Sequence, residues 1–118
     1  MYNIKVESNF SSAHNLRGYK GRCEDLHGHN WRVLIEIEKE KLDKIGMVLD
    51  FRSVKRQLNS LLDKLDHKYL NKIPYFTKVN PTSESIAKFI YDSLKKKIPC
   101  LKSVTVWESE NCCATYSE

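Results

Sequence analysis

The stretch Cys23–Glu38, CEDLHGHNWRVLIEIE, joins a cluster of ligand-type side chains to a strand pattern. From His29 onward apolar and polar residues alternate, which predicts a half-buried β-strand. His27 and His29 are two residues apart, so on an extended segment their side chains lie on the same face. Because neutral imidazole is the commonest metal ligand, this pair indicates a metal site. The apolar face of the strand carries Trp31, Val33, Ile35 and Ile37.

A second alternating segment precedes this stretch. Apolar and polar residues alternate over residues 2–12, which predicts another half-buried strand, and His14 follows just past its end. We expect the two strands to pair as an antiparallel hairpin joined by a long basic loop over residues 15–25. Structureless loops of that length are usually functional. In such a hairpin His14, His27 and His29 can converge at one end of the sheet.

The rest of the chain predicts two amphipathic helices followed by two short strands. Apolar residues recur at helical spacing after Asp50, which is a plausible N-cap. Glycine, proline and asparagine punctuate the segments at turn positions. The predicted segments are a helix over 51–65, a helix from Thr82 or Ser83 to before Pro99, and strands over 101–110 and 112–116.

The order strand, strand, helix, helix, strand, strand predicts an α+β fold. Segregated strands and helices favour a four-stranded antiparallel sheet with two helices on one face. The other face of that sheet would carry Leu34 and Trp107 beside charged residues, so we expect the protein to assemble with further copies.

The composition favours one globular domain spanning residues 1–118. Hydrophobic residues make up 41% and charged residues 30% of the chain, which is ordinary for a soluble protein. No apolar run reaches transmembrane length, and residues 1–7 hold no apolar signal core, so we expect a cytoplasmic protein without a membrane partner. The net charge of +5 is either a solvated surface or an attraction for an anionic ligand. Basic and aromatic residues are not interleaved in one stripe, which argues against a nucleic-acid partner.

Three histidines with an open fourth position would form a catalytic zinc site. Such a metal polarises a substrate oxygen or lowers the pKa of a bound hydroxyl. Three imidazoles also suit other divalent ions. The alternative is that His14 is an ordinary surface histidine and that His27 and His29 belong to a turn.

The chain has four cysteines and no CxxC pair, so we expect them to be reduced. Cys100, Cys112 and Cys113 are expected to be small buried residues. Cys23 differs because it lies four residues before His27. It is a thiolate that serves as base or nucleophile, a buried thiol, or a fourth metal ligand that closes the site.

Three further groups could carry chemistry. Asp66 and His67 follow the first helix, where they are either a helix-end pair or two groups that reach a shared cleft. Glu108 continues the register of an apolar strand face, where a carboxylate costs free energy unless it is paired or meets a ligand. A carboxylate can grip a guanidine-like edge through two parallel hydrogen bonds. Glu84 lies in the first turn of a helix, which the helix dipole explains.

Taken together, these segments resemble the 6-pyruvoyl-tetrahydropterin synthase family, including its bacterial branch, 6-carboxy-tetrahydropterin synthase of the queuosine pathway. Each segment alone is weak, but the ordered set covers nearly the whole chain and is specific. The segments are Phe10–His14, Cys23–His29, Val48–Phe51, Leu65–Asn71, Asn80–Glu84 and Glu108.

The resemblance implies a tunnelling fold (T-fold) in which three subunits close their sheets into a barrel. Two trimers would stack into a homohexamer with active sites between subunits. It also implies zinc on the three histidines, with Cys23 as the general base or acid. Asp66 and His67 would form a catalytic relay that reaches into the active site from a neighbouring subunit. The pterin ring would be held by Glu108 with Thr82, Ser83 or Glu84, and the triphosphate by the loop containing Lys20 and Arg22.

The spacing points to the bacterial branch, because only three residues separate Cys23 from the HGH run. The implied reaction converts 7,8-dihydroneopterin triphosphate to 6-carboxy-5,6,7,8-tetrahydropterin, with release of acetaldehyde and triphosphate. The pyruvoyl activity is the alternative. Glu24 opens another, because a folate-pathway branch uses a glutamate there and releases 6-hydroxymethyl-dihydropterin, so both roles can coexist. Glu24 can equally be a solvated loop acid. A non-enzymatic zinc- or pterin-binding module is the alternative of a different class.

Overall fold

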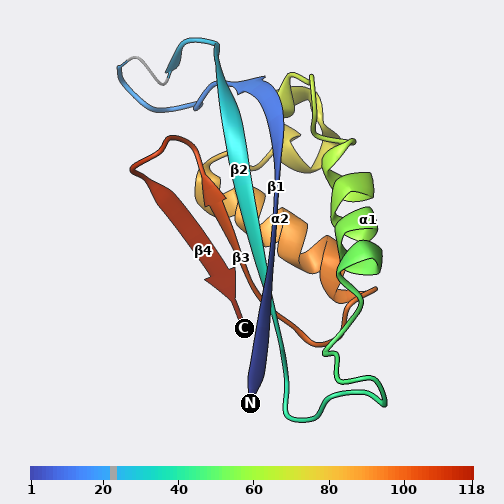
Figure 1. Ribbon diagram of the computed structural model, residues 1–118. Coiled ribbons are helices and arrows are strands. Elements are labelled where there is room, and N and C mark those ends of the chain that lie inside the picture. The colour runs from blue at the N-terminus through green and yellow to red at the C-terminus, as the bar shows by residue number, and fades with distance from the viewer. Residues whose placement is uncertain (22–23) are drawn as a thin grey trace.

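A four-stranded antiparallel sheet, in the order β1-β2-β3-β4, carries two α-helices on one face (Figure 1). The computed structural model describes residues 1–21 and 24–118. The arrangement confirms the predicted α+β order. The elements are β1 (Tyr2–His14), β2 (His27–Lys39), α1 (Phe51–Leu62), the short 3-10 helices η2 (Leu70–Lys72) and η3 (Pro74–Thr77), α2 (Ser83–Lys95), β3 (Leu101–Trp107) and β4 (Cys113–Ser117).

The long β1–β2 ribbon sets which side chains share a face. Val6 lies opposite Ile35, and Phe10 lies opposite Trp31, so the predicted apolar faces meet under the helices. The pairing continues to His14 opposite His27, because β1 runs two residues beyond its predicted end. His14 therefore lies within β1 rather than just past its end, and with His27 and His29 it extends the apolar face of the sheet.

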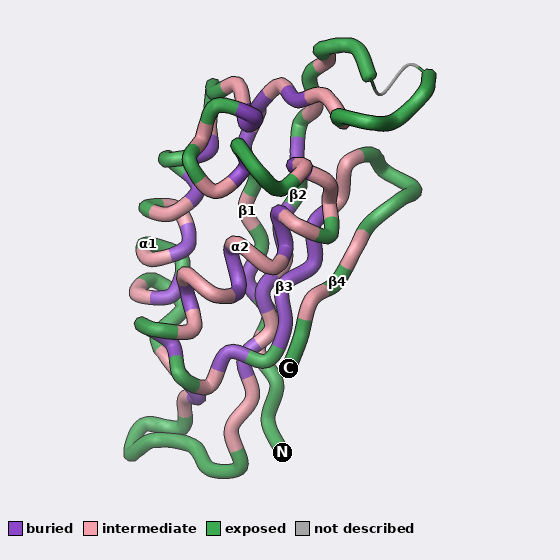
Figure 2. Tube along the Cα trace, turned by 180° about the vertical axis from the view of Figure 1, so that it is seen from behind, coloured by how far each residue is buried: buried purple, intermediate pink, exposed green. Residues whose placement is uncertain are grey.

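The core lies between this face and the helices, as the buried trace in Figure 2 shows. The predicted helix ends early, at Leu62 rather than Leu65. The backbone N–H of Leu65 donates to the carbonyl of Leu62, so the last turns tighten to a three-residue spacing while Leu65 stays buried. Both predicted N-caps are confirmed: Asp50 accepts from the N–H of Arg52, and the side chain of Thr82 caps α2.

Two sequence predictions are wrong in detail. The segment that Pro74 and Pro81 bracket reads as a loop in the sequence, but it begins with the 3-10 helix η3, which buries Phe76; just before it, η2 buries Leu70. Cys112 and Cys113 are exposed rather than buried, because Cys112 lies in the turn before the short edge strand β4 and Cys113 is the first residue of that strand; Cys100 is half-buried. No helix in the described part of the chain is both long and apolar enough to span a membrane.

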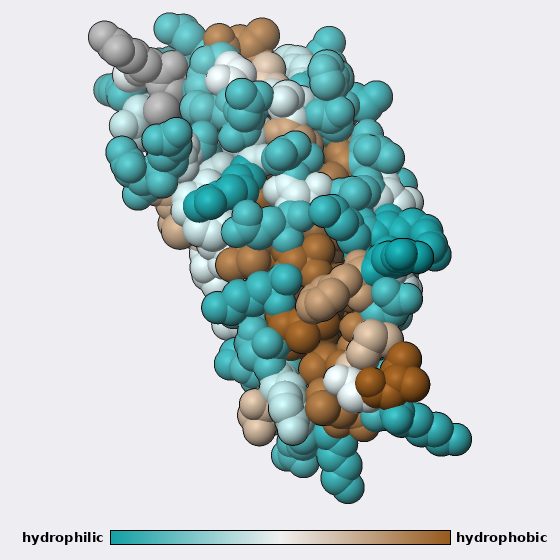
Figure 3. All heavy atoms as spheres, in the orientation of Figure 1, coloured by the Kyte–Doolittle hydropathy of each residue, from teal (hydrophilic) through white to brown (hydrophobic). Residues whose placement is uncertain are grey.

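The molecule is elongated, with extents of 53 × 24 × 22 Å. Apolar side chains gather toward the end that holds the N-terminus, the lower end in Figure 3. A groove of about 300 Å³ lies there, between the start of β1 and the start of α1. Its lining includes Tyr2, Ile4, Leu42, Val48 and Phe51. The three histidines of β1 and β2 lie at the opposite end of the ribbon.

Candidate metal centre

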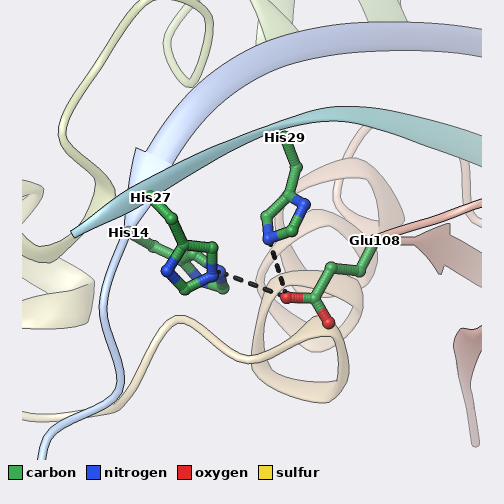
Figure 4. A group of neighbouring side chains, drawn as sticks. All are labelled: His14, His27, His29 and Glu108. Atoms are coloured by element: carbon green, nitrogen blue, oxygen red, sulfur yellow. Dashed lines mark hydrogen bonds and ion pairs between the residues drawn. The ribbon is translucent and has the colours of Figure 1, made fainter. Parts of the chain in front are cut away.

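Three imidazoles and one carboxylate meet at the far end of the β1–β2 ribbon (Figure 4). His14 Nε2 lies 3.0 Å from His27 Nε2 and 3.2 Å from Glu108 Oε1. His29 Nε2 lies 3.0 Å from the same Glu108 oxygen. All four ligand atoms lie within 4.8 Å of one another. The β1–β2 register brings the histidines together, and Glu108 comes from the residue just after β3.

Backbone carbonyls orient two of the rings. His14 Nδ1 donates to the carbonyl of Pro81 at 2.7 Å, and His27 Nδ1 donates to the carbonyl of Asp25 at 2.7 Å. A neutral imidazole that donates through Nδ1 has a free lone pair on Nε2. In both rings Nε2 is the atom turned toward the cluster. Among the described residues, the buried His29 Nε2 has no well-aligned hydrogen-bond partner, although Glu108 Oε1 lies 3.0 Å away.

Burial favours the neutral form of these rings. Desolvation lowers the pKa of His14, which is only 1% exposed, and the hydrogen bond to Pro81 opposes that shift. Desolvation also lowers the pKa of His29, against the attraction of the Glu108 carboxylate. Trp31 is fully buried and meets both rings edge to face. His14 and His29 therefore favour the neutral form that metal binding requires.

The donor set fits a divalent metal ion. Ligand atoms about 2.0 Å from a tetrahedral zinc ion lie about 3.3 Å apart. The contacts His14–His27, His14–Glu108 and His29–Glu108 lie at 3.0, 3.2 and 3.0 Å. The orphaned His29 Nε2 would gain a partner in the bound ion. His14, His27, His29 and Glu108 could therefore hold a metal ion.

The start of α2 adjoins this centre through Pro81, whose carbonyl holds His14. Thr82 is the N-cap, with its hydroxyl accepting from the N–H of Ser85 at 3.1 Å. Ser83 is half-buried and Glu84 is exposed. The residues predicted to bind the pterin ring, Thr82, Ser83 and Glu84, thus directly follow Pro81, which contacts the metal ligand His14.

Asp66 and His67 form a pair outside the four-residue cluster. Asp66 Oδ2 accepts from His67 Nδ1 at 2.8 Å, and Asp66 Oδ1 accepts from the N–H of Ser11 at 2.8 Å. The Ser11 N–H, followed by His67, lowers the pKa of Asp66. His67 has a φ of 55°, an unusual backbone for a residue other than glycine, and its side chain is 83% exposed. The pair lies on the edge of β1 that β2 does not cover, at the histidine end of the sheet.

The loop before β2 holds the remaining predicted residues. Cys23 and Arg22 lie outside the described residues. Glu24 is exposed, and its backbone N–H donates to the carbonyl of Gly21. Lys20 is exposed as well.

Two asparagines that sequence reasoning left without a role hold the first part of this loop. Asn71 is buried, accepts from the N–H of Asn15 at 3.0 Å and donates to its carbonyl at 2.9 Å. Asn80 makes the same reciprocal pair with Arg17, at 3.0 and 2.8 Å. Both lie in segments that carried the family resemblance, which was the one available signal. They tie the loop to η2 and to the residues before α2.

A four-stranded antiparallel sheet with two helices on one face, and with three imidazoles and a carboxylate at one end, defines a small α+β protein with a candidate metal centre. The family model described as 6-pyruvoyl tetrahydropterin synthase matches residues 3–118, and the chain belongs to that family. The sheet and helices are the T-fold of this family, as predicted.

Individual relatives span nearly the whole chain. A 6-carboxy-5,6,7,8-tetrahydropterin synthase of Synechocystis sp. is 37% identical over 122 residues, covering 98% of this chain and 93% of the relative. The 6-pyruvoyl tetrahydrobiopterin synthase of Homo sapiens is 34% identical over 112 residues, covering 90% and 77%. The structure of Caenorhabditis elegans 6-pyruvoyl tetrahydropterin synthase superposes with a TM-score of 0.91 at 28% identity, covering 99% and 95%. The family is one of tetrahydropterin synthases, which are enzymes.

Proposed function

We propose that this protein is a zinc-dependent 6-carboxy-5,6,7,8-tetrahydropterin synthase, a lyase of the queuosine (7-deazapurine) pathway made of one domain. It would convert 7,8-dihydroneopterin triphosphate to 6-carboxy-5,6,7,8-tetrahydropterin, releasing acetaldehyde and triphosphate. The observation that carries the proposal is the convergence of His14, His27 and His29 through their Nε2 atoms. The identity to the Synechocystis synthase and the short spacing between Cys23 and His27 support this branch.

Each remaining site residue has a proposed task. A bound zinc ion would polarise the side-chain oxygens of the substrate and so make their protons more acidic. Cys23 would move protons on the substrate side chain as general base or acid. The Asp66 carboxylate orients His67 through Nδ1, which leaves Nε2 free to exchange a proton. Thr82, Ser83 and Glu84 would bind the pterin ring together with Glu108.

We propose that the active site is completed by a neighbouring copy in a homohexamer of two trimers. His67 is 83% exposed and lies on the edge of β1 that β2 does not cover, so a second copy could contact it. β1 and β4 are the edge strands of the sheet and could pair between copies. The face opposite the helices carries half-buried Leu34 and Trp107, which such a barrel would enclose. We keep the cytoplasm as the proposed location.

The pyruvoyl product is the second candidate, because the human relative bears that name at 34% identity. Glu24 keeps the hydroxymethyl product as a third candidate. It is an exposed carboxylate next to Asp25, and the Asp25 carbonyl accepts from His27 Nδ1. A binding module would instead have a fourth protein ligand closing the metal site permanently.

Product identity tests the proposal. The zinc-loaded protein is incubated with 7,8-dihydroneopterin triphosphate, and the products are identified by mass. We expect 6-carboxy-tetrahydropterin and acetaldehyde. A pyruvoyl product would assign the second candidate, hydroxymethyl-dihydropterin alone would reject the queuosine role, and no turnover would favour a binding module. Cys23→Ala should abolish the carboxy product, while Glu24→Ala, a matched loop substitution, should retain it.

A further inference from the structure

Glu108 is proposed to bind the pterin ring, yet its carboxylate lies among the metal-binding histidines. One carboxylate oxygen, Oε1, lies 3.2 Å from His14 Nε2 and 3.0 Å from His29 Nε2. Figure 4 shows this oxygen turned toward the rings rather than away from them. These spacings are close to the roughly 3.3 Å expected between two ligands of one tetrahedral ion. The carboxylate therefore occupies the place of a fourth ligand.

A centre with four protein ligands is closed. Structural zinc sites have four protein ligands, whereas catalytic sites keep one position for water or substrate. The carboxylate also brings a negative charge that would weaken the polarising effect of the ion on the substrate. The proposed reaction therefore requires one of the four groups to leave.

The four groups differ in how firmly the protein holds them. His14 is 1% exposed and donates to the Pro81 carbonyl, and His27 donates to the Asp25 carbonyl. His29 is 24% exposed and packs against the buried ring of Trp31. Glu108 is the most exposed of the measured three at 34%, and it lies one residue beyond the end of β3.

The side chain of Glu108 also has little else to hold it. The described contacts of its carboxylate are those with His14 and His29, and its backbone N–H donates to the Cys112 carbonyl at 3.3 Å in the β3–β4 turn. Rotation about its side-chain torsions would withdraw the carboxylate without breaking the strand.

We propose that Glu108 is an exchangeable fourth metal ligand that leaves the ion when the pterin binds. The released carboxylate then accepts two parallel hydrogen bonds from the amino and ring N–H groups of the pterin edge. Binding of the pterin ring thus frees the fourth coordination position of the ion. A ligand that lacks the amino and ring N–H groups of the pterin would leave that position filled by Glu108. This inference rests on the proposed function for the identity of the pterin ligand.

The first test measures metal affinity without turnover. Cobalt(II) is bound to the metal-free protein, its affinity is measured by competition with a chromophoric chelator, and its visible absorption is recorded. Glu108→Gln keeps the shape of the side chain and should weaken cobalt binding by about tenfold or more. Glu110→Gln makes the same charge change on the exposed turn, outside the cluster, and should match the unaltered protein. Equal affinity and equal spectra for all three proteins would overturn the ligand role.

The second test follows the exchange itself. Neopterin, an oxidised pterin without triphosphate, is added to the cobalt-loaded protein. We expect its absorption to change in the unaltered protein and in Glu110→Gln, and a different, smaller change in Glu108→Gln, where no carboxylate has to leave. Free triphosphate should leave the spectrum unchanged. An identical pterin-induced change with and without the Glu108 carboxylate would overturn the exchange.

The two proposals fail separately. If the protein forms the carboxy product but Glu108→Gln keeps the affinity and spectrum of the unaltered protein, the exchange is wrong and the function stands. If Glu108→Gln loses cobalt affinity but dihydroneopterin triphosphate is never converted, the ligand role stands and the proposed function is wrong. Circular dichroism of each variant checks that it is folded.

Discussion

The two ends of the β1–β2 ribbon share one backbone register and differ in what they hold. At one end, His14 pairs with His27, and the imidazoles meet Glu108. At the other, Tyr2 pairs with Lys39 beside an apolar groove of about 300 Å³. Each end also lies near the beginning of a helix, α2 through Pro81 and α1 through Phe51.

The difference shows how this fold combines stability with chemistry. The same sheet face that buries Val33 and Ile35 continues into His29 and His27, so the metal ligands are presented by the most regular part of the structure. The groove is lined mainly by apolar side chains, and the metal-ligand cluster found among the described residues lies at the other end. Substitutions at the histidine end should therefore change function, and substitutions at the groove end should change stability.

The largest effect is expected for His29→Ala. Loss of a ligand removes the metal and with it the polarisation of the substrate, worth about 4 kcal/mol, so turnover should fall about a thousandfold. Metal content by elemental analysis and turnover by product mass are the measurements. Denaturant unfolding of the metal-free variant should change by only about 1 kcal/mol. Turnover within about tenfold of the unaltered protein would remove His29 from the centre.

At the groove end, Val48→Ala should show the reverse pattern. Val48 is 5% exposed and packs in the core. Deleting two buried methyl groups should lower the free energy of unfolding by about 2 kcal/mol, measured by urea denaturation. The metal affinity of the folded protein should stay unchanged. A matching loss of metal affinity would mean that the two ends are coupled.

The two helix N-caps offer a finer comparison. Thr82 accepts from the N–H of Ser85 at 3.1 Å, and Asp50 accepts from the N–H of Arg52 at 2.9 Å. Thr82→Ala and Asp50→Ala should each cost about 1 kcal/mol of stability. Only Thr82→Ala should also raise KM, because the residue before it holds His14. Equal KM values in both variants would show that the N-cap of α2 has no effect on substrate binding.

The smallest effect is a pH dependence of the metal-free protein. In the folded state, burial lowers the pKa values of His14 and His29 below 6.5, the ordinary value for histidine. Below pH 6.5 the unfolded chain therefore binds protons that the folded chain does not, and the free energy of unfolding should decrease as the pH falls. Urea unfolding between pH 7.5 and about 5.5 measures this, and His14→Gln should reduce the slope. A stability that rises toward low pH would contradict the burial argument.

Much of the fold could be predicted because the sequence pattern and the burial agree. Alternation placed Val6 and Ile35 on one face, and helical spacing together with Asp50 placed α1. The end of α1 was missed because Leu65 keeps the apolar spacing after the backbone has tightened into turns. The 3-10 helices were missed because their three or four residues are too short for any periodicity to show.

Part of the site could also be predicted from the alternation of the sequence pattern. A two-residue spacing on a strand indicated that His27 and His29 share a face, and hairpin pairing brought His14 to them. The closeness of Glu108 to His14 and His29 depends on the β2–β3 register, which no single segment encodes. The roles of Asn71 and Asn80 depend on tertiary hydrogen bonds across more than 50 residues of sequence.

The most direct test of the account is a zinc titration of the metal-free protein. Turnover of 7,8-dihydroneopterin triphosphate is measured at each step and compared with the same titration of His29→Ala. We predict that activity rises in proportion to added zinc and stops rising at about one ion per chain, with no rise in His29→Ala. Full turnover by the metal-free protein, or the same titration curve in His29→Ala, would contradict a metal centre on His14, His27 and His29.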